Sequence, residues 1–332
     1  MKRGHLEKQL KNNELHSILE RSVRVQFNID HDQSDRRADN FLFSQFKNVP
    51  KSVIYRLIRQ GQIKANRKKI KPDYRLKKGD EITVYSLKLP EHFSQQPSLP
   101  SKESIEKLTK RILYEDGDLL ILDKPVGMAV HGGTQVSWGV IEILRQAGRD
   151  QPFLELAHRL DRETSGCLVI AKKRSVLREL HQLFREGKVQ KVYYALTCGH
   201  WKEKHHQVSA HLVKNSQISG ERKVKVDEEG KYSITEFQSV RRFPLADFVK
   251  VKLFTGRTHQ IRVHASNAGH PLAGDEKYGD KAFNRIMKQL GLRRLFLQAA
   301  KINFTLPSRG KIINIEIPLD EELSKFLEKL ML

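Results

Sequence analysis

Residues 158–166 read HRLDRETSG and place one carboxylate, Asp161, in a polar loop directly before an apolar stretch. The stretch that follows, Cys167–Ala171 (CLVIA), is typical of a buried strand. A loop joined to a buried strand holds its side chains in a fixed orientation, which a catalytic group requires. Arg159 and Arg162 flank Asp161, and their charges favour the ionised carboxylate. A lone loop aspartate more often caps a turn, so further residues are needed to identify a site.

A second segment, TGRTHQIRVH at residues 255–264, follows the alternating stretch Asp247–Phe254, which predicts a half-buried strand. The spacing of apolar residues after it predicts a helix. Arg257 and Arg262 would then point in different directions, because five residues advance about 500° around a helix. One arginine could hold a catalytic carboxylate and the other a phosphate. The alternative is that both are solvated surface residues.

The charge of the chain points to a polyanionic partner. Its 332 residues include 61 Lys and Arg against 39 Asp and Glu, a formal net charge of +22. Lys47 to Lys78 contains 12 basic residues and one acid, Asp73. Such a one-signed segment repels itself, and nucleic acid relieves that repulsion with release of counterions. A solvated surface that only keeps the protein soluble is the alternative.

We predict a tail at residues 1–33, a small module at 34–86, a linker at 87–104 and a larger domain at 105–332. In the module, Pro50–Gln60 has one apolar face, which predicts a helix, and short strands are expected at Gln62–Asn66 and Glu81–Tyr85. This order, with the run GQIKAN at residues 61–66, resembles the S4 RNA-binding domain. The module's predicted RNA contacts are Lys51, Arg56, Arg59, Lys68 and Lys69.

Other features argue against several classes of protein. No apolar run approaches the length of a membrane span, and no signal peptide is predicted. The two cysteines, Cys167 and Cys198, are too few for a disulfide-rich or cysteine–zinc fold, which favours a cytoplasmic location. No phosphate-binding glycine motif occurs, so no nucleotide cofactor is expected. A histidine group between His200 and His211 lacks zinc-site spacing, so no metal is predicted.

Four motifs occur in order across the larger domain: KPVGMAVH at residues 124–131, HRLDRETSG at 158–166, KVYYAL at 191–196 and TGRTHQIRVH at 255–264. In these motifs the chain resembles the RluA-type RNA pseudouridine synthases. With the S4-like module it is most similar to their RluC-like branch, which acts on large-subunit ribosomal RNA. The similarity covers about Asp35 to Pro318. It implies an α+β fold whose catalytic domain has a mixed, mainly antiparallel sheet, with a small S4-like module before it.

The resemblance also implies the site residues. The nucleophile would be Asp161, paired with Arg262, or less favourably with Arg257. Tyr193 would be the active-site tyrosine, Arg159 would enter the space left by the flipped base, and Leu297 would pack under the uracil. Gln298 stands where relatives commonly have a histidine, which makes the placement of that last motif weaker.

The expected reaction moves the uracil from a C1′–N1 to a C1′–C5 bond, with no net redox change and no cofactor. Whether Asp161 attacks ribose C1′, attacks uracil C6 or first helps remove a ribose proton stays open. The expected partner is large-subunit ribosomal RNA, free or in an assembling subunit, and the protein is expected to be a monomer. Two rival classes remain: a non-catalytic RNA-binding or assembly protein, and a hydrolase of nucleosides or nucleic acid.

Overall fold

A computed structural model describes residues 24–30, 33–46, 49, 51–85, 100–132, 138–148, 153–216 and 222–331. The chain divides into two compact units, Met1–Ser98 and Leu99–Leu332. Most of the predicted tail, most of the predicted linker, Lys47 and Pro50 lie outside the described residues.

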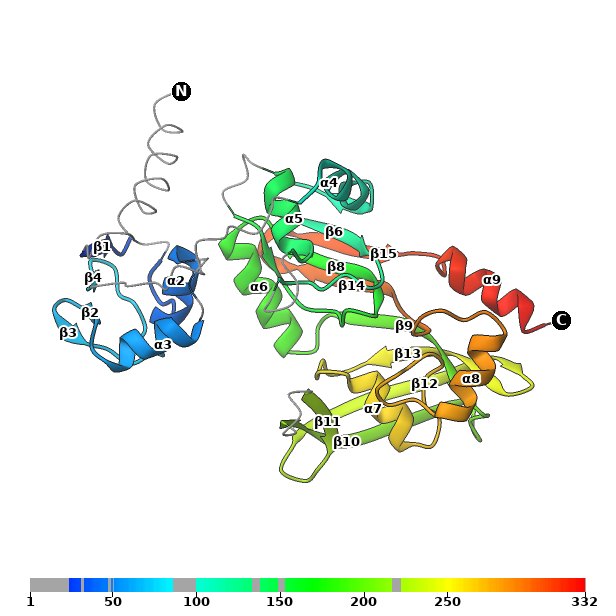
Figure 1. Ribbon diagram of the computed structural model, residues 1–332. Coiled ribbons are helices and arrows are strands. Elements are labelled where there is room, and N and C mark those ends of the chain that lie inside the picture. Colours follow the sequence, from blue (N-terminus) through cyan, green and yellow to red (C-terminus); the bar gives the residue numbers. More distant parts are fainter. Residues whose placement is uncertain are drawn as a thin grey trace. The chain divides into compact units, whose positions relative to one another are not determined.

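The described residues of the N-terminal unit combine a small antiparallel sheet with helices α2 and α3 (Figure 1). The sheet has the order β1-β4-β2-β3, and the elements are β1 (Val25–Asn28), α2 (Ala38–Gln45), α3 (Lys51–Arg59), β2 (Ile63–Ala65), β3 (Lys68–Lys69) and β4 (Glu81–Val84). α3, β2 and β4 confirm the predicted helix and strands. β1 lies in the stretch predicted as a tail, yet it pairs with β4 along its whole length. With four residues it is too short to show a clear sequence period.

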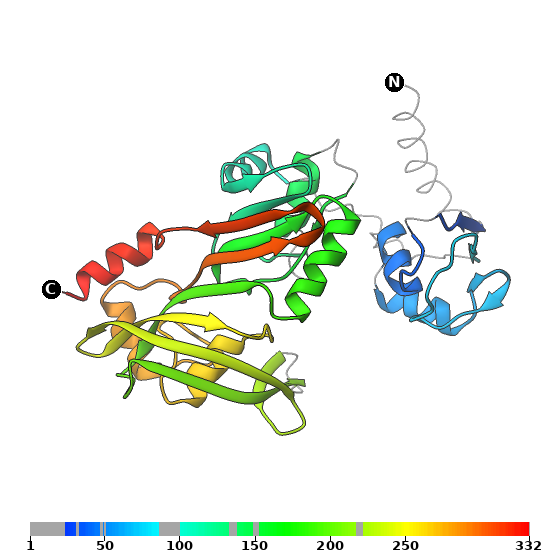
Figure 2. The same cartoon turned by 180° about the vertical axis from the view of Figure 1, so that it is seen from behind.

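The described residues of the C-terminal unit form one eleven-stranded sheet, shown from opposite sides in Figures 1 and 2. Its strand order is β11-β10-β12-β13-β9-β14-β8-β6-β5, while β15 pairs with β14 and β7 with β8. The strands are β5 (Ile112–Glu115), β6 (Leu119–Lys124), β7 (Glu155–Leu156), β8 (Ser165–Ala171), β9 (Gln190–Cys198), β10 (His205–Ser216), β11 (Arg222–Val226), β12 (Lys231–Phe243), β13 (Ala246–Leu253), β14 (Leu297–Leu306) and β15 (Lys311–Glu316). Among these strands only the β8–β14 pair is parallel. The predicted α+β class with a mainly antiparallel sheet is confirmed.

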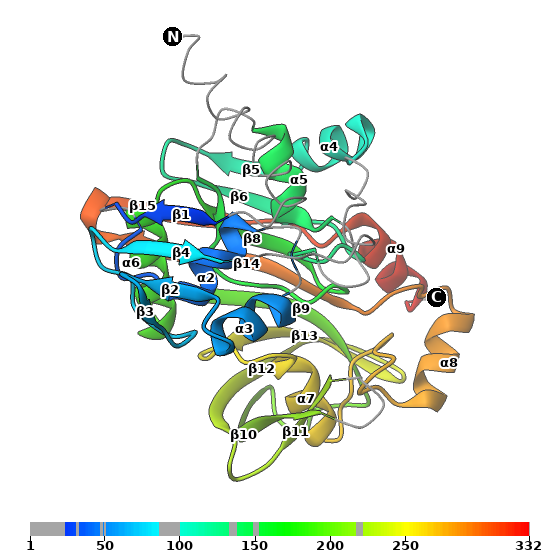
Figure 3. The same ribbon diagram turned by 60° about the vertical axis from the view of Figure 1, so that its left-hand side comes forward.

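Helices cover both faces of this sheet. One face packs against α4 (Lys102–Thr109), α5 (Val140–Ala147) and α7 (Gln260–Asn267). The opposite face packs against α6 (Arg174–Arg185), α8 (Lys281–Gln289) and α9 (Glu321–Lys329). In Figure 3, α7 lies beside β10, β11 and β12, which it contacts. α4 begins inside the predicted linker, at Lys102, where Ser101 caps its N-terminus. No described helix is long and apolar enough to span a membrane.

The middle of the sheet brings distant segments together. β14 lies between β9 and β8, so the loop before β8, the centre of β9 and the start of β14 become neighbours. Gly166, the last residue of HRLDRETSG, has a φ of +106°. A Cβ at Gly166 would lie 2.2 Å from the carbonyl oxygen of Ala299. Only glycine therefore allows β8 to approach β14 this closely.

Candidate active site

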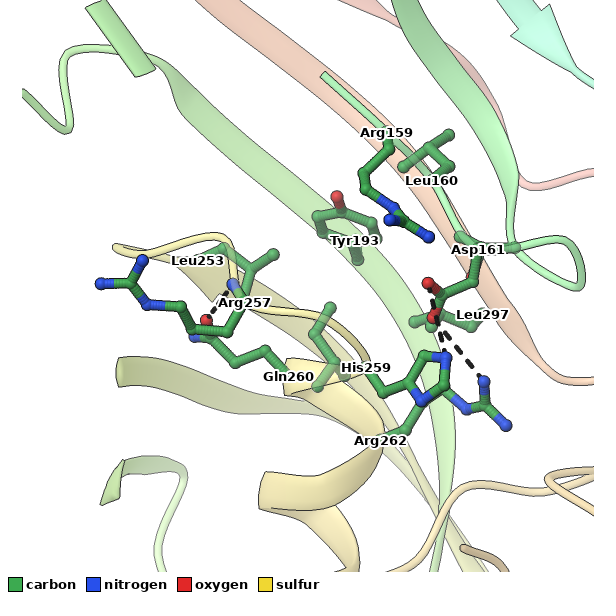
Figure 4. A pocket seen from close by; sticks show the side chains of 12 residues that line it. Arg159, Leu160, Asp161, Tyr193, Leu253, Arg257, His259, Gln260, Arg262 and Leu297 are labelled. Carbon is green, nitrogen blue, oxygen red and sulfur yellow. Dashed lines mark hydrogen bonds and ion pairs between the residues drawn. The ribbon is translucent and has the colours of Figure 1, made fainter. Parts of the chain in front are cut away.

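A cleft opens where these central strands meet the start of α7 (Figure 4). It is lined by Arg159, Leu160, Asp161, Thr164, Tyr193, Leu253, Arg257, His259, Gln260, Ile261, Arg262 and Leu297. The six cleft residues predicted from the sequence all lie in this lining. The strand order explains their convergence, because the segments that carry them are adjacent in the sheet or packed on one face of it.

Asp161 faces two nitrogen donors, one toward each of its oxygens (Figure 4). Arg262 Nη1 lies 3.6 Å from Asp161 Oδ2, and His259 Nε2 lies 3.8 Å from Oδ1. The side chain of Asp161 is 18 % exposed, so the carboxylate is accessible from the cleft although little of its surface meets solvent. An ionised carboxylate can only accept hydrogen bonds, so a donor on either nitrogen would interact favourably with Asp161.

Arg262 is held in place by a second carboxylate. Its Nε and Nη2 donate to the two oxygens of Asp275 at 2.7 and 2.8 Å. The backbone N–H groups of Lys277 and Tyr278 also donate to Asp275 Oδ1, at 2.9 and 3.0 Å. Burial opposes the charge of Arg262, but hydrogen bonds to Asp275 raise its pKa above the usual value. Two of its N–H groups bind Asp275, which leaves Nη1 to face Asp161.

A buried lysine, Lys124, binds the backbone of the loop that carries Asp161. Lys124, at the end of β6, is fully buried, and its Nζ donates to the carbonyl oxygens of Pro125, Met128 and Arg162. Burial lowers the pKa of Lys124 to about 7, although the charges of Glu163 and Asp161 counteract it. The KPVG motif therefore has a structural role: its lysine ties the end of β6 to the backbone beside Asp161.

The arginines of the site have separate environments. Arg257 is exposed, its Nε donates to the carbonyl oxygen of Tyr232 at 3.3 Å, and its side chain points away from Asp161 (Figure 4). Arg262, and not Arg257, thus lies within ion-pair distance of Asp161. Arg159 is also exposed, and within the described part of the chain it has no ion pair. Arg162 Nε donates to the carbonyl oxygen of Gly127. This arginine is therefore used in a contact other than the one with Asp161 that its position in the sequence suggested.

Tyr193 and Leu297 form the buried side of the cleft, 7 % and 3 % exposed. Burial, and secondarily the charge of Asp161, raise the pKa of Tyr193 well above its usual value. The phenol therefore stays neutral at physiological pH. Gln298, next to Leu297, does not line the cleft. Its side chain donates to the carbonyl oxygen of Pro318 and accepts from the backbone N–H of Asp320.

Among the residues that were not predicted from the sequence, three titratable ones contact the charged groups of the site: His259, Asp275 and Tyr278. His259 lies within the quoted motif TGRTHQIRVH, which is a signal that could have identified it. Asp275 and Tyr278 come from a loop after α7, where no hydrophobic period indicates which polar residue is buried. Gly274 before them has a φ of +73°, and a Cβ there would lie 2.1 Å from the carbonyl oxygen of Arg294. Asp275 follows directly in this closely packed loop and is 1 % exposed.

The predicted RNA contacts of the N-terminal unit are all exposed, and none of them forms an ion pair with a described residue: Lys51, Arg56, Arg59, Lys68 and Lys69. In the described ranges, no group of three or more His, Cys, Asp or Glu side chains is placed to hold a metal ion. In the histidine group between His200 and His211, a ring nitrogen of His200 lies 2.7 Å from the backbone carbonyl oxygen of Phe243, which is a structural contact.

Comparisons with known proteins identify the family of the chain. The RNA pseudouridylate synthase family model matches residues 118–267, and the S4 domain model matches residues 36–82. The chain is 48 % identical to ribosomal large subunit pseudouridine synthase C of Escherichia coli strain K12, over 90 % of this chain and 94 % of that one. Identity to the Pasteurella multocida protein of the same name is also 48 %, over 93 % and 94 %. The solved structure of human RNA pseudouridylate synthase domain containing 4 is 26 % identical, with a TM-score of 0.57 over 68 % of this chain and 95 % of that one. The matched segment holds Asp161, Tyr193 and Arg262, and the chain belongs to the RNA pseudouridylate synthase family.

Proposed function

We propose that this protein converts specific uridines of large-subunit ribosomal RNA to pseudouridine, with Asp161 as the nucleophile. The observation that carries the proposal is the partly buried Asp161 carboxylate, which faces Arg262 and His259 in a cleft beside Tyr193 and Leu297. The relatives from Escherichia coli and Pasteurella multocida, whose names state this activity, support the choice of RNA.

The reaction balances without a cofactor or water. The C1′–N1 bond of uridine breaks, a C1′–C5 bond forms, C5 loses its proton and N1 gains one. A carboxylate that faces Arg262 can attack ribose C1′ or uracil C6, or can help remove a ribose proton. Tyr193, as a neutral phenol, can stack on the target base, and its raised pKa disfavours a role as a phenolate base.

The target base must leave its stack to reach Asp161, at a cost of a few kcal/mol. Arg159 is exposed at the rim of the cleft and free of ion pairs within the described residues, so its guanidinium can fill the vacated space. Leu297 offers an apolar surface for the uracil ring. The exposed basic residues of α3 and β3 hold the RNA backbone, which makes binding salt-dependent.

We further propose that residues 34–86, together with β1, act as the RNA-binding module, that the chain between β4 and α4 links it to the catalytic domain, and that the protein works as a cytoplasmic monomer. Analytical ultracentrifugation of the full chain would check the last point, because a stable dimer contradicts it.

The central test uses full-length protein with Asp161→Asn. Wild type should release tritium from large-subunit ribosomal RNA labelled at uridine C5, and Asp161→Asn should lower that rate by at least about a thousandfold. Asp73→Asn, at an exposed acid of the N-terminal unit, is the matched control. Pseudouridine formed at the normal rate by Asp161→Asn would refute the proposal. Free uracil or shortened RNA chains in the wild-type reaction would instead establish a hydrolase.

A further inference from the structure

His259 occupies an unusual backbone conformation at the start of α7. It is the N-cap residue, with φ 52° and ψ 21°, in the left-handed region that only a few per cent of non-glycine residues adopt, histidine being among the more frequent of them. Such a conformation is strained and persists where the surroundings impose it, often at functional sites. Here the conformation turns the imidazole into the cleft, toward Asp161 (Figure 4).

The far nitrogen of the ring is bound to a tyrosine. His259 Nδ1 lies 2.8 Å from the hydroxyl oxygen of Tyr278, and the same oxygen accepts a hydrogen bond from the backbone N–H of Val224 at 2.9 Å. If the Tyr278 O–H donates to Nδ1, the proton of a neutral imidazole sits on Nε2. The opposite assignment would point a bare Nε2 lone pair at the Asp161 carboxylate, which is repulsive.

The charged and titratable groups that face His259 are Asp161, Arg262, Lys277 and Asp275, together with the Tyr278 hydroxyl at Nδ1. Burial lowers the pKa of His259, with Asp161 opposing and Arg262 reinforcing that effect. The ring is therefore neutral at physiological pH, and its single N–H must be placed by a hydrogen bond. Tyr278 also lies under Arg262, whose Cζ is 5.1 Å from the centre of the phenol ring. One tyrosine thus contacts both groups that face Asp161.

We propose that the Tyr278 hydroxyl fixes the tautomer of His259 with its proton on Nε2, and that this N–H positions the Asp161 carboxylate through Oδ1 while Arg262 holds Oδ2. His259 is then a positioning residue, and Tyr278 acts through it. The 3.8 Å separation exceeds a hydrogen bond, and we expect it to shorten when RNA fills the cleft. The inference rests on the proposed function, since it assigns a role relative to a catalytic Asp161.

The test measures single-turnover tritium release by full-length variants at saturating RNA. His259→Ala should slow the reaction by about 10- to 100-fold with little change in RNA affinity. His259→Gln, whose amide N–H can reach the same oxygen, should restore most of the rate. His205→Ala removes an exposed histidine of β10 and should react like wild type.

Tyr278→Phe supplies a readout that a purely structural role would not produce. Without the hydroxyl, neutral His259 can lose its Nε2 proton to Nδ1, so the rate should fall by about 3- to 10-fold at pH 8. The ring nitrogens report the tautomer directly: nitrogen NMR of His259 should show the proton on Nε2 in wild type and a shift of that proton toward Nδ1 in Tyr278→Phe. An Nε2 proton that is retained in Tyr278→Phe, or a Gln variant as slow as Ala, would overturn the inference. Neither result touches the proposed function, which is tested separately by the activity of Asp161→Asn and by the products of the wild-type reaction.

Discussion

Charged side chains differ in burial and pairing between two regions of the molecule: the basic residues of α3 and β3, and the cleft. Lys68 and Lys69 are exposed and have no acidic partner among the described residues. Arg262, by contrast, has a side chain only 9 % exposed and is placed between Asp161 and Asp275. The exposed charges act by their number and are screened by salt. The buried charges act by position, so each depends on its partner.

The largest expected effect comes from removing the anchor of Arg262. Asp275→Asn should leave the buried guanidinium without its paired charge and destabilise the protein by about 3–5 kcal/mol. It should also slow tritium release, because Asp275 no longer aims Arg262 Nη1 at Asp161. Urea unfolding and single-turnover rates would measure both. Asp227→Asn, at a surface ion pair with Lys225, is the control and should change stability far less. A stable, fully active Asp275→Asn protein would contradict the anchoring role.

The buried lysine provides a pH-dependent comparison. Because burial lowers the pKa of Lys124 to about 7, the penalty for its charge is complete below pH 7 and is relieved as the pH rises toward the usual lysine value. The stability of wild type relative to Lys124→Met should therefore increase above pH 7, by at most about 1.4 kcal/mol per pH unit. Urea unfolding at pH 7, 8 and 9 measures this slope. The exposed Lys69→Met variant is the control, and equal slopes for both variants would argue against a buried, destabilised charge.

Exposed charges should have smaller, salt-dependent effects. The double variant Lys68→Gln/Lys69→Gln should weaken RNA binding and reduce the slope of log affinity against log salt by about 0.7–0.9 for each phosphate that the protein no longer neutralises. The rate at saturating RNA should not change. Lys107→Gln/Lys110→Gln removes the same charge from α4, where both lysines pair with glutamates, and serves as the control. An unchanged salt slope in the β3 variant would show that these lysines do not bind RNA.

The smallest expected effect separates the two arginines of TGRTHQIRVH. Arg257→Gln should change the rate at saturating RNA by less than about threefold, because its guanidinium points away from Asp161. Arg262→Gln should lower the same rate by more than about a hundredfold. Similar reductions in both variants would mean that Arg257 also reaches the reacting atoms.

Local signals along the chain were sufficient to predict a large part of this protein. Alternating or helical apolar spacing predicted β13, α3 and the strand after Asp161. The motifs indicated the family and gave Asp161, Tyr193 and Arg262 as candidate site residues. The boundaries were less accurate: β1 and the start of α4 fell in segments predicted as tail and linker. Short elements take their stability from tertiary packing, which leaves no strong period in the chain.

The pairing of polar groups in the cleft, in contrast, depends on tertiary packing. The choice of Arg262 over Arg257 depends on where α7 begins, at Gln260, a boundary that local pattern does not determine. Asp275 and Tyr278 reach the site because their loop packs against Arg294, and Lys124 reaches the Asp161 loop because β6 pairs with β8. These contacts join residues far apart in sequence. Their free energy comes from burial and charge pairing in the folded state. The amino-acid sequence shows no periodic pattern that would reveal such long-range contacts.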